Sequence, residues 1–395
     1  MTTFLHLQGR TAIEKYAKNL QICGSLSRLF SNSNIPYLQY RVSEQIFCKS
    51  FDADDLSRSD IAVDATKAEL GLGIKTFGAK PRNHSFEKIA EFNADRNSYN
   101  DLSTEEKIRK ISELRNHRIE FAKNGHNLGA CQYHCIIRRE GYFDLCEEEM
   151  PIISLDKIKN IKSTGPSIRF EDDRHEYNFN FSKSTLFKRF WTDKPVKRIP
   201  IEIMPDPMSL LDGILQEKAS SYGKKQEQLP INFATFTEQA EFVLQPEVEH
   251  YPTAYLPLYG KNKTVQEKAG LNQWNAAGRQ RDPDEVYIPV PAKFHHRYPG
   301  FFPPKDTKFE LILPGKKTIS AKICQDGSKA LMSDPNKELG RWILRDVLRL
   351  RDGELLTIDR LYQLGIDSVR IDKLANGVYE MNFAAVDSFE DFIND

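Results

Sequence analysis

The sequence predicts an α/β amino-terminal domain followed by a mainly β carboxy-terminal domain, and three observations lead to this division. Up to about residue 200, segments with apolar residues at three- and four-residue spacing alternate with short apolar runs rich in glycine and β-branched residues. Residues 201–247 break the composition with prolines and a long polar run. Beyond residue 248, short apolar runs are separated by proline and glycine, as in barrels and sandwiches. The predicted units are therefore a domain at 1–200, a connector at 201–247 and a domain at 248–395.

The composition is that of a folded chain with more than one core. The chain has 395 residues, of which 28% are charged and 11% aromatic, and this is too much core-forming material for a disordered protein. No stretch approaches the roughly 18 apolar residues of a membrane helix, and the first residues lack the pattern of a secretory signal. The six cysteines are too few and too scattered for a disulfide framework. We expect a soluble, reduced, cytoplasmic protein.

The charge is balanced overall but unevenly distributed. Lysine plus arginine and aspartate plus glutamate both number 56, so the formal net charge is zero. Residues 279–351 hold 15 basic and 9 acidic side chains, whereas residues 352–395 hold 3 basic and 10 acidic ones. Two ordinary solvated faces would explain this asymmetry, but a basic segment before an acidic tail also makes binding of a polyanion worth considering.

The amino-terminal domain is expected to alternate helices with strands. Helical spacing predicts helices at 11–23, 41–51, 84–96 and 104–122, with Ser43 as a plausible cap of the second. Short runs predict strands at 61–65, 69–77, 132–139 and 177–182, and the first two of these strands are expected to be adjacent.

The carboxy-terminal domain is expected to be built from short strands. These are predicted at 254–259, 285–291, 308–315, 318–324 and 378–383, with helices at about 337–348 and 359–364. Two long polar insertions, at 268–284 and 325–342, interrupt the strands.

Asp64 and Lys75 are the first candidate catalytic pair. Hydrolysis of a phosphodiester at neutral pH uses hard divalent cations, and Mg²⁺ takes oxygen ligands, typically one or two carboxylates together with phosphate. A lysine beside such a site can orient or deprotonate the attacking water. Asp64 lies in the run Ile-Ala-Val-Asp-Ala and Lys75 eleven residues later in Leu-Gly-Ile-Lys-Thr-Phe, so a hairpin would place them side by side. A surface hairpin without catalytic function is the alternative.

The stretch from residue 57 to residue 77 resembles the active-site region of PD-(D/E)XK nucleases found among restriction endonucleases. The resemblance implies a mixed sheet flanked by helices, with Asp64 and Lys75 in the active site and Mg²⁺ as the cofactor. The sequence departs from the family pattern at Gly73, where an acid is expected two residues before the lysine. Some members carry that acid on the following helix. This predicts Glu91, or less favourably Glu87, as the second metal ligand beside Asp64, with Asp60 and Glu44 as further candidates.

Rival motifs fit poorly. The cluster of Cys131, His134, Cys135 and Cys146 has no paired zinc-ligand spacing and lies in an apolar run, which favours buried free cysteines. No histidine stands two residues before a lysine, as a phospholipase-D-type nuclease requires, and no Walker-type phosphate loop is present.

The two polar insertions of the carboxy-terminal domain are rich in amide, guanidinium, ammonium and hydroxyl groups, which are the kinds of group that read DNA bases in other proteins. Arginine pairs with guanine, asparagine and glutamine with adenine, and acids with cytosine, while lysine and serine contact phosphates. Solvated loops are the alternative.

Residues 250–383 are similar to the carboxy-terminal DNA-recognition domain of NgoFVII-type restriction endonucleases, a pseudobarrel related to the plant B-three-type transcription-factor domain. The resemblance is carried by Gly270-Leu-Asn-Gln-Trp-Asn, by Glu285-Val-Tyr-Ile-Pro-Val-Pro, by Ser320-Ala-Lys-Ile-Cys-Gln-Asp-Gly-Ser-Lys and by Leu339-Gly-Arg-Trp-Ile-Leu-Arg-Asp-Val-Leu. It implies two arms that grip DNA. The implied contact residues are Asn272, Gln273, Trp274, Arg279 and Arg281 in the first arm and Gln325, Asp326, Lys329, Ser333 and Asn336 in the second. Core packing is an equal alternative for Trp274 and for Trp342.

Together the resemblances imply a type II restriction endonuclease that cuts double-stranded DNA and leaves 5′-phosphate ends. Enzymes with this DNA-recognition domain often carry a phospholipase-D nuclease, which this chain lacks. A non-catalytic, sequence-specific DNA-binding regulator with an amino-terminal interaction module is the alternative. A restriction enzyme needs a cognate DNA methyltransferase, expected to be encoded nearby, and a homodimer would supply two active sites for the two strands.

Overall fold

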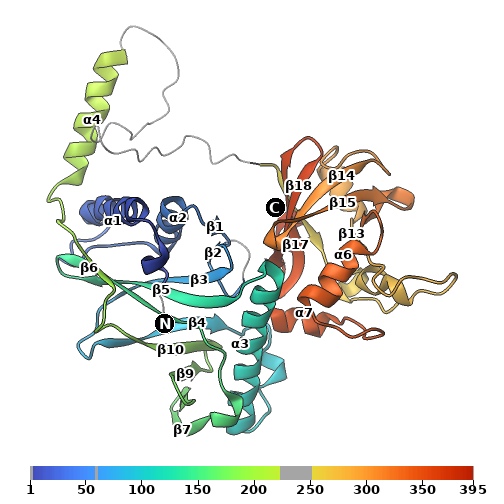
Figure 1. The fold of residues 1–395 in the computed structure, drawn as a ribbon, viewed down its shortest axis with the longest axis horizontal. Coiled ribbons are helices and arrows are strands. Elements are labelled where there is room, and N and C mark those ends of the chain that lie inside the picture. The colour runs from blue at the N-terminus through green and yellow to red at the C-terminus, as the bar shows by residue number, and fades with distance from the viewer. Residues whose placement is uncertain (1–2, 58–60, 223–250, 395) are drawn as a thin grey trace.

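The computed structural model describes residues 3–57, 61–222 and 251–394, and its three sheets form two domains (Figure 1). The amino-terminal domain contains a six-stranded and a five-stranded sheet, and the carboxy-terminal domain is built on a seven-stranded sheet. No helix in these ranges is both long and apolar enough to cross a membrane.

The six-stranded sheet carries the predicted Asp64–Lys75 hairpin. Its strands, in spatial order, are β1 (Asp54–Asp55), β2 (Ala65–Lys67), β3 (Leu70–Gly78), β5 (Ala130–Arg139), β6 (Tyr142–Glu149) and β11 (Lys197–Pro200). β3 pairs antiparallel with β2 and parallel with β5. Helices α1 (Arg10–Ser25) and α2 (Tyr40–Phe51) pack on one face, where Tyr16 and Phe47 meet Ile74 in a buried cluster.

The other face of this sheet points toward α3 (Thr104–His126) and the five-stranded sheet. The strands of that second sheet, in spatial order, are β4 (His84–Glu91), β10 (Thr185–Trp191), β9 (Glu176–Asn180), β8 (Ser167–Glu171) and β7 (Lys159–Thr164). α3 begins with a reciprocal cap, because Ser103 accepts from the backbone of Glu106 while the Glu106 carboxylate accepts from the backbone of Ser103. Its apolar side, including Ile108 and Leu114, packs on the inner face of the second sheet.

The carboxy-terminal sheet curls into a half-barrel. Its strands, in spatial order, are β12 (Thr253–Pro257), β17 (Ile366–Ala375), β18 (Val378–Ala385), β14 (Lys308–Leu313), β15 (Lys317–Cys324), β16 (Ala330–Ser333) and β13 (Ile288–Pro289). Its helices are α5 (Ala292–Arg297), α6 (Glu338–Gly340), which continues as a π-helix over Arg341–Val347, α7 (Ile358–Leu364) and α8 (Ser388–Asn394). A large cluster of aliphatic and aromatic side chains fills the half-barrel.

Most predicted helices are confirmed, and one is wrong. α1, α2, α3 and α7 lie where the apolar spacing places them, although Gln39 rather than Ser43 caps α2. Residues 84–91 form strand β4 instead of a helix, because they pair along their whole length with β10. The predicted strand at 285–291 shrinks to the two residues of β13.

The connector contains the helix α4 (Pro207–Tyr222), and the rest of the predicted connector, 223–247, lies outside the described residues.

The two domains meet along α3. Phe121 of α3 is buried in the carboxy-terminal core, with its ring centroid 4.9 Å from that of Phe383. Arg118, also on α3, donates to the carbonyl of Gln363 at 3.4 Å, to the carbonyl of Glu91 at 2.7 Å and to the carboxylate of Asp95 at 2.9 Å. A single helix therefore belongs to the packing of both domains.

Candidate active site and DNA-binding arms

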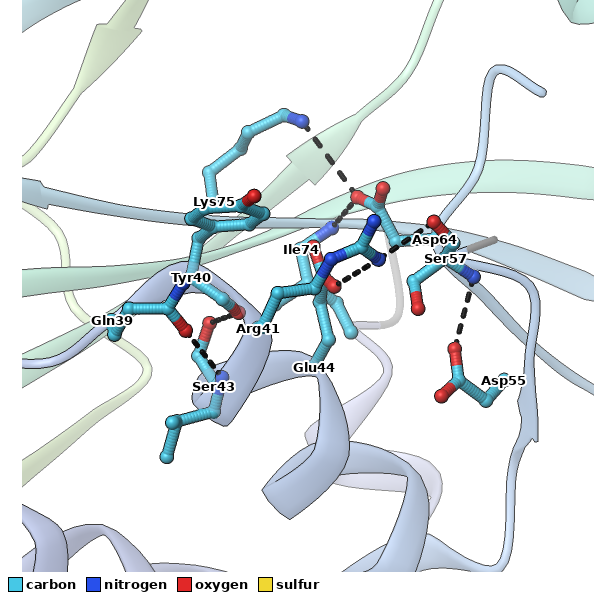
Figure 2. A network of polar contacts seen from close by, with 11 residues as sticks. Gln39, Tyr40, Arg41, Ser43, Glu44, Asp55, Ser57, Asp64, Ile74 and Lys75 are labelled. Carbon is cyan, nitrogen blue, oxygen red and sulfur yellow. Dashed lines mark hydrogen bonds and ion pairs between the residues drawn. The ribbon is translucent and has the colours of Figure 1, made fainter. Parts of the chain in front are cut away.

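Asp64 is held at the start of the β2–β3 hairpin by its own backbone. Its N–H donates to the carbonyl of Leu72 at 2.8 Å, and its carbonyl accepts from the N–H of Leu56 at 3.0 Å. The carboxylate Oδ2 accepts from the N–H of Ile74 at 2.7 Å, so the side chain lies against β3 (Figure 2). The local fold therefore fixes this carboxylate beside the strand that carries Lys75.

Lys75 and Asp64 lie together as the hairpin prediction requires. The Lys75 Nζ is 3.7 Å from Asp64 Oδ2, and both side chains keep partial access to water. Burial lowers the pKa of Lys75, but the charge of Asp64 and the nearby Tyr133 outweigh burial, so the pKa stays above its ordinary value. At neutral pH Lys75 is therefore an ammonium ion, suited to orienting a water or a phosphate oxygen rather than to accepting a proton.

Glu44 joins this pair from α2. Its side chain is only 6% exposed, and Arg41 donates to its carboxylate at 3.1 Å. Burial first, and then the charge of Asp64, raise the pKa of Glu44 to about 7. A second carboxylate is thus placed close enough to Asp64 for the two charges to repel each other (Figure 2).

Gly73 cannot be replaced by the acid of the family pattern. A Cβ atom at this position would lie 2.6 Å from Met150 Cε and 2.9 Å from Tyr133 Cδ1. Tyr133 is buried, and its hydroxyl accepts a hydrogen bond from Arg115, so the ring is held in place. The space that an acidic side chain would need is therefore filled.

A cavity of about 760 Å³ surrounds the pair and reaches both domains. Glu44, Asp64 and Lys75 line it together with Glu87, Lys88 and Glu91 of β4 and Arg115 and Arg118 of α3. The carboxy-terminal domain contributes Gly365, Ala385 and Val386 to its wall.

The other predicted acids have different surroundings. Glu91 lines the cavity from the end of β4, and its carboxylate is engaged by Lys88 and Asn93. Glu87 also faces the cavity, and burial raises its pKa above the ordinary value, against the lowering effects of Ser85 and of cations including Lys75. Asp60 lies outside the described residues.

The residues present are compatible with Mg²⁺. Asp64 and Glu44 offer only oxygen donors, and a cation between them would relieve the repulsion that, after burial, contributes to the raised pKa of Glu44. The structure groups no three histidine, cysteine or acidic side chains into a metal site within the ranges it describes, and a site of two carboxylates completed by phosphate is the usual arrangement for Mg²⁺.

The rejected zinc cluster has another role. His134 is buried, with Nδ1 2.8 Å from a Glu147 oxygen and Nε2 2.9 Å from the Tyr16 hydroxyl. Both ring nitrogens are therefore engaged, and Cys131, Cys135 and Cys146 are buried free cysteines.

Two of the residues predicted to contact DNA are buried and hold the protein backbone instead. Asn272 is 1% exposed, donates to the carbonyls of Gln266 and Leu356 and accepts from the N–H of Leu356. Ser333 is also buried, and its hydroxyl oxygen accepts from the N–H of Leu339 at 2.9 Å. Both side chains stabilise the backbone of the arms through these hydrogen bonds, and they are buried away from any DNA.

The structure buries Trp342 and leaves Trp274 partly exposed. Trp274 packs against the carboxy-terminal core, and Trp342 lies inside it, stacked on Phe383 with ring centroids 5.4 Å apart.

The arginines of the first arm share a buried anchor that the sequence pattern does not reveal. Arg279, with a side chain 54% exposed, and Arg281, 14% exposed, both contact the buried carboxylate of Glu285. Gln273 lies half-buried in the same arm, within reach of Arg281. Arg279 is therefore the arginine of this arm that reaches furthest into solvent.

The second arm keeps several predicted residues at the surface. Asp326 and Lys329 are exposed, and Gln325 and Asn336 are partly exposed. Next to the tip of this arm, a hollow of about 700 Å³ is lined by Ser328 and by three lysines. These are Lys305 and Lys308, which lie three residues apart, and Lys373, which is distant from them in the sequence.

The two arms touch each other at one end. Lys337 of the second arm lies 4.0 Å from Asp282 of the first, and Arg345, just beyond the second arm, donates to the carboxylate of Asp284 at 2.7 Å. The base of the second arm joins the sheet where Ser333 pairs with Ala321 of β15, and its tip follows Cys324 at the end of that strand. The arms therefore meet near the base of the second arm, where Gly340 also lies against the backbone of Asp284.

Comparison with known families supports this interpretation of the carboxy-terminal domain. No curated protein matches the chain. Residues 247–375, about a third of the chain, match the family described as the NgoFVII C-terminal B3-like DNA-binding domain. The carboxy-terminal part of the chain is thus similar to a DNA-binding domain of the type found in restriction enzymes.

Proposed function

We propose that the protein is a type II restriction endonuclease, in which the carboxy-terminal domain reads double-stranded DNA and the cavity around Asp64 cuts it. The observation that carries the proposal is the cluster of Asp64, Lys75 and Glu44 in a cavity whose wall includes residues of the DNA-binding domain. DNA held by that domain would thus lie beside carboxylates and an ammonium group, which is the chemistry that phosphodiester hydrolysis needs.

Asp64 and Glu44 are the residues that would hold Mg²⁺, with Glu91 at the same cavity as a further candidate. The ion, when bound, supplies neutralisation of the phosphate charge and a water of lowered pKa. The ammonium group of Lys75 orients the attacking water or a non-bridging phosphate oxygen by donating a hydrogen bond. Arg115 and Arg118 add positive charge to the wall that a phosphodiester would face. Attack on phosphorus with loss of the 3′ oxygen leaves a 5′-phosphate and a 3′-hydroxyl.

The proposal includes two functional partners. A cognate methyltransferase would protect the host DNA. A homodimer would bring two such cavities to the two strands of one site.

Digestion of a sequenced phage DNA tests the proposal. The purified protein is incubated with the DNA in the presence of Mg²⁺ and, separately, of excess chelator. Discrete fragments that appear only with Mg²⁺ and carry 5′-phosphate ends support it. DNA that is shifted in a gel but stays intact at all divalent-ion concentrations would instead identify a non-catalytic DNA-binding regulator.

A further inference from the structure

The outer side of the five-stranded sheet carries aromatic and basic side chains that the proposed function leaves unused. The inner side buries Leu186, Phe190 and their neighbours against the rest of the domain. Because side chains alternate along a strand, Phe187, Arg189 and Trp191 of β10 point to the other side. Trp191 is 55% exposed there, which is unusual for a large aromatic residue.

The strand register joins these side chains into rows. Trp191 lies opposite His84, Arg189 opposite Phe86, and Phe187 opposite Lys88. The last row continues across all five strands, in the order Lys88, Phe187, Asn178, Arg169 and Lys162. With strands about 4.8 Å apart, this row is about 19 Å long. We call the side formed by these residues the aromatic face.

Guanidinium groups lie over the rings of the aromatic face. Arg189 is 5.3 Å from the centroid of Phe86 and 5.5 Å from that of Trp191, and Arg169 is 5.5 Å from that of Phe86. Arg189 is held in this position by Glu176 at 2.5 Å. Rings and guanidinium planes are the two kinds of protein surface on which unpaired bases stack.

The charge of the aromatic face fits a polyanion. In the described part of the chain, Arg169 and Lys162 have no acidic side chain within ion-pair distance, whereas the acids Glu176 and Glu171 are paired with Arg189 and with Lys159. Excess positive charge therefore lies beside the rings. In a duplex the bases are already stacked and paired, so rings on a sheet can engage only an unpaired strand.

We infer that the aromatic face binds a single-stranded nucleic acid, with bases on Phe86, Phe187 and Trp191 and phosphates beside Arg169 and Lys162. This activity is separate from the reading of duplex DNA by the carboxy-terminal domain. It does not depend on cleavage in the Asp64 cavity. Lys88, at one end of the row, also lines that cavity, so a strand on the aromatic face extends toward it.

Tryptophan fluorescence provides a direct test with the full chain. Of the three tryptophans, Trp342 is buried, Trp274 is partly buried against the carboxy-terminal core and Trp191 is the most exposed, so a signal that disappears in Trp191→Ala reports on the aromatic face. Titration with single-stranded oligothymidylate, without divalent ions, is expected to quench the emission in a saturable way. Oligouridylate of the same length distinguishes DNA from RNA as the preferred strand, and binding of either supports the inference.

Variants separate stacking from simple charge attraction. Trp191→Ala, Phe86→Ala and Phe187→Ala, measured by anisotropy of a labelled strand, are each expected to weaken binding about tenfold. Phe30→Ala, which removes an aromatic ring 68% exposed that is not part of the five-stranded sheet, is the matched control and should bind as the wild type does. Arg169→Gln should weaken binding and reduce its salt dependence.

Three results would overturn the inference. The first is that neither oligonucleotide binds in a saturable way. The second is that heparin competes with the oligonucleotide equally well and that all three ring variants bind it with unchanged affinity. The third is that Phe30→Ala weakens binding of the oligonucleotide as much as the ring variants do. Trp191 is exposed, so its replacement leaves the fold intact, and unchanged duplex binding by the same variant confirms this. Loss of DNA cleavage has no bearing on this test, which uses no metal.

Discussion

At the scale of single residues, Lys75 is the side chain whose chemistry is most clearly defined by its neighbours. The adjacent Asp64 keeps it protonated, so its contribution is a fixed positive charge and hydrogen-bond donors. We expect Lys75→Ala to abolish cleavage of plasmid DNA and to leave sequence-specific binding intact, as measured by gel shift. Lys67→Ala is the matched control, because Lys67 lies on the neighbouring strand and contacts Asp52 outside the cavity. Full activity of the Lys75 variant would refute the active site.

Glu44 gives the protein a predicted pH dependence. Its folded-state pKa of about 7 lies above the ordinary value of 4.5, so folding is favoured by protonation. This contribution is complete below about pH 4.5 and is lost as the pH rises through about 7. Without divalent ions, Glu44→Gln should therefore be more stable than the wild type at pH 8, by up to roughly 3 kcal/mol, and similar to it near pH 4.5. Urea unfolding at the two pH values checks this, and an equal difference at both would contradict it.

The arginines of the first arm are expected to differ in function. Arg281→Ala leaves the buried Glu285 with a single partner, and we expect a loss of about 1–3 kcal/mol in unfolding free energy. Arg279→Ala should change stability little and instead relax the preference at one base position, at a cost of about 1–3 kcal/mol in binding. Selection from a randomised duplex library measures the preference. Uniform weakening on every sequence would make Arg279 a phosphate contact.

At the scale of elements, the close contact between the two arms depends on Gly340. A Cβ atom there would overlap the carbonyl oxygen of Asp284, so the close approach of the end of α6 to the end of the first arm requires a glycine at this position. We expect Gly340→Ala to cost at least about 2–3 kcal/mol, because the obstacle is backbone.

Gly125 provides the control for this prediction. It lies in α3, and a Cβ atom added to it would have no neighbouring atom within 4 Å, so Gly125→Ala should be neutral or stabilising by up to about 1 kcal/mol. Thermal unfolding of the two variants is the measurement. Equal changes in the unfolding temperature of the two variants would show that the two arms can move apart without loss of stability.

The elements also show what the sequence can and cannot predict. The helices were predictable because α1, α2 and α3 place apolar residues at helical spacing on one packed side. Strand β4 was not predictable, because its partner β10 lies about a hundred residues away in the sequence. Pairing with such a distant strand overrides a weak local pattern. Asp64 and Lys75 were brought together by a local hairpin, whereas the burial of Asn272 depends on Leu356, far along the chain.

At the scale of the whole molecule, α3 couples the two domains through Phe121. Phe121→Ala removes a buried ring from the junction and should cost about 3–5 kcal/mol. We expect calorimetry to show two separated transitions in place of one. Phe179→Ala, in the core of the amino-terminal domain alone, is the control and should lower only the transition of that domain. A single transition lowered alike by both variants would contradict the coupling.

The participation of Gly365, Ala385 and Val386 in the wall of the candidate cavity has a practical consequence for protein engineering. A chimaera that grafts a foreign recognition module onto residues 1–200 would leave this cavity open on one side and Arg118 without its carbonyl acceptor at Gln363. Changing sequence preference by exchanging arm residues inside the native scaffold would keep both intact. Redesign should therefore begin in the arms and retain the β17–β18 hairpin.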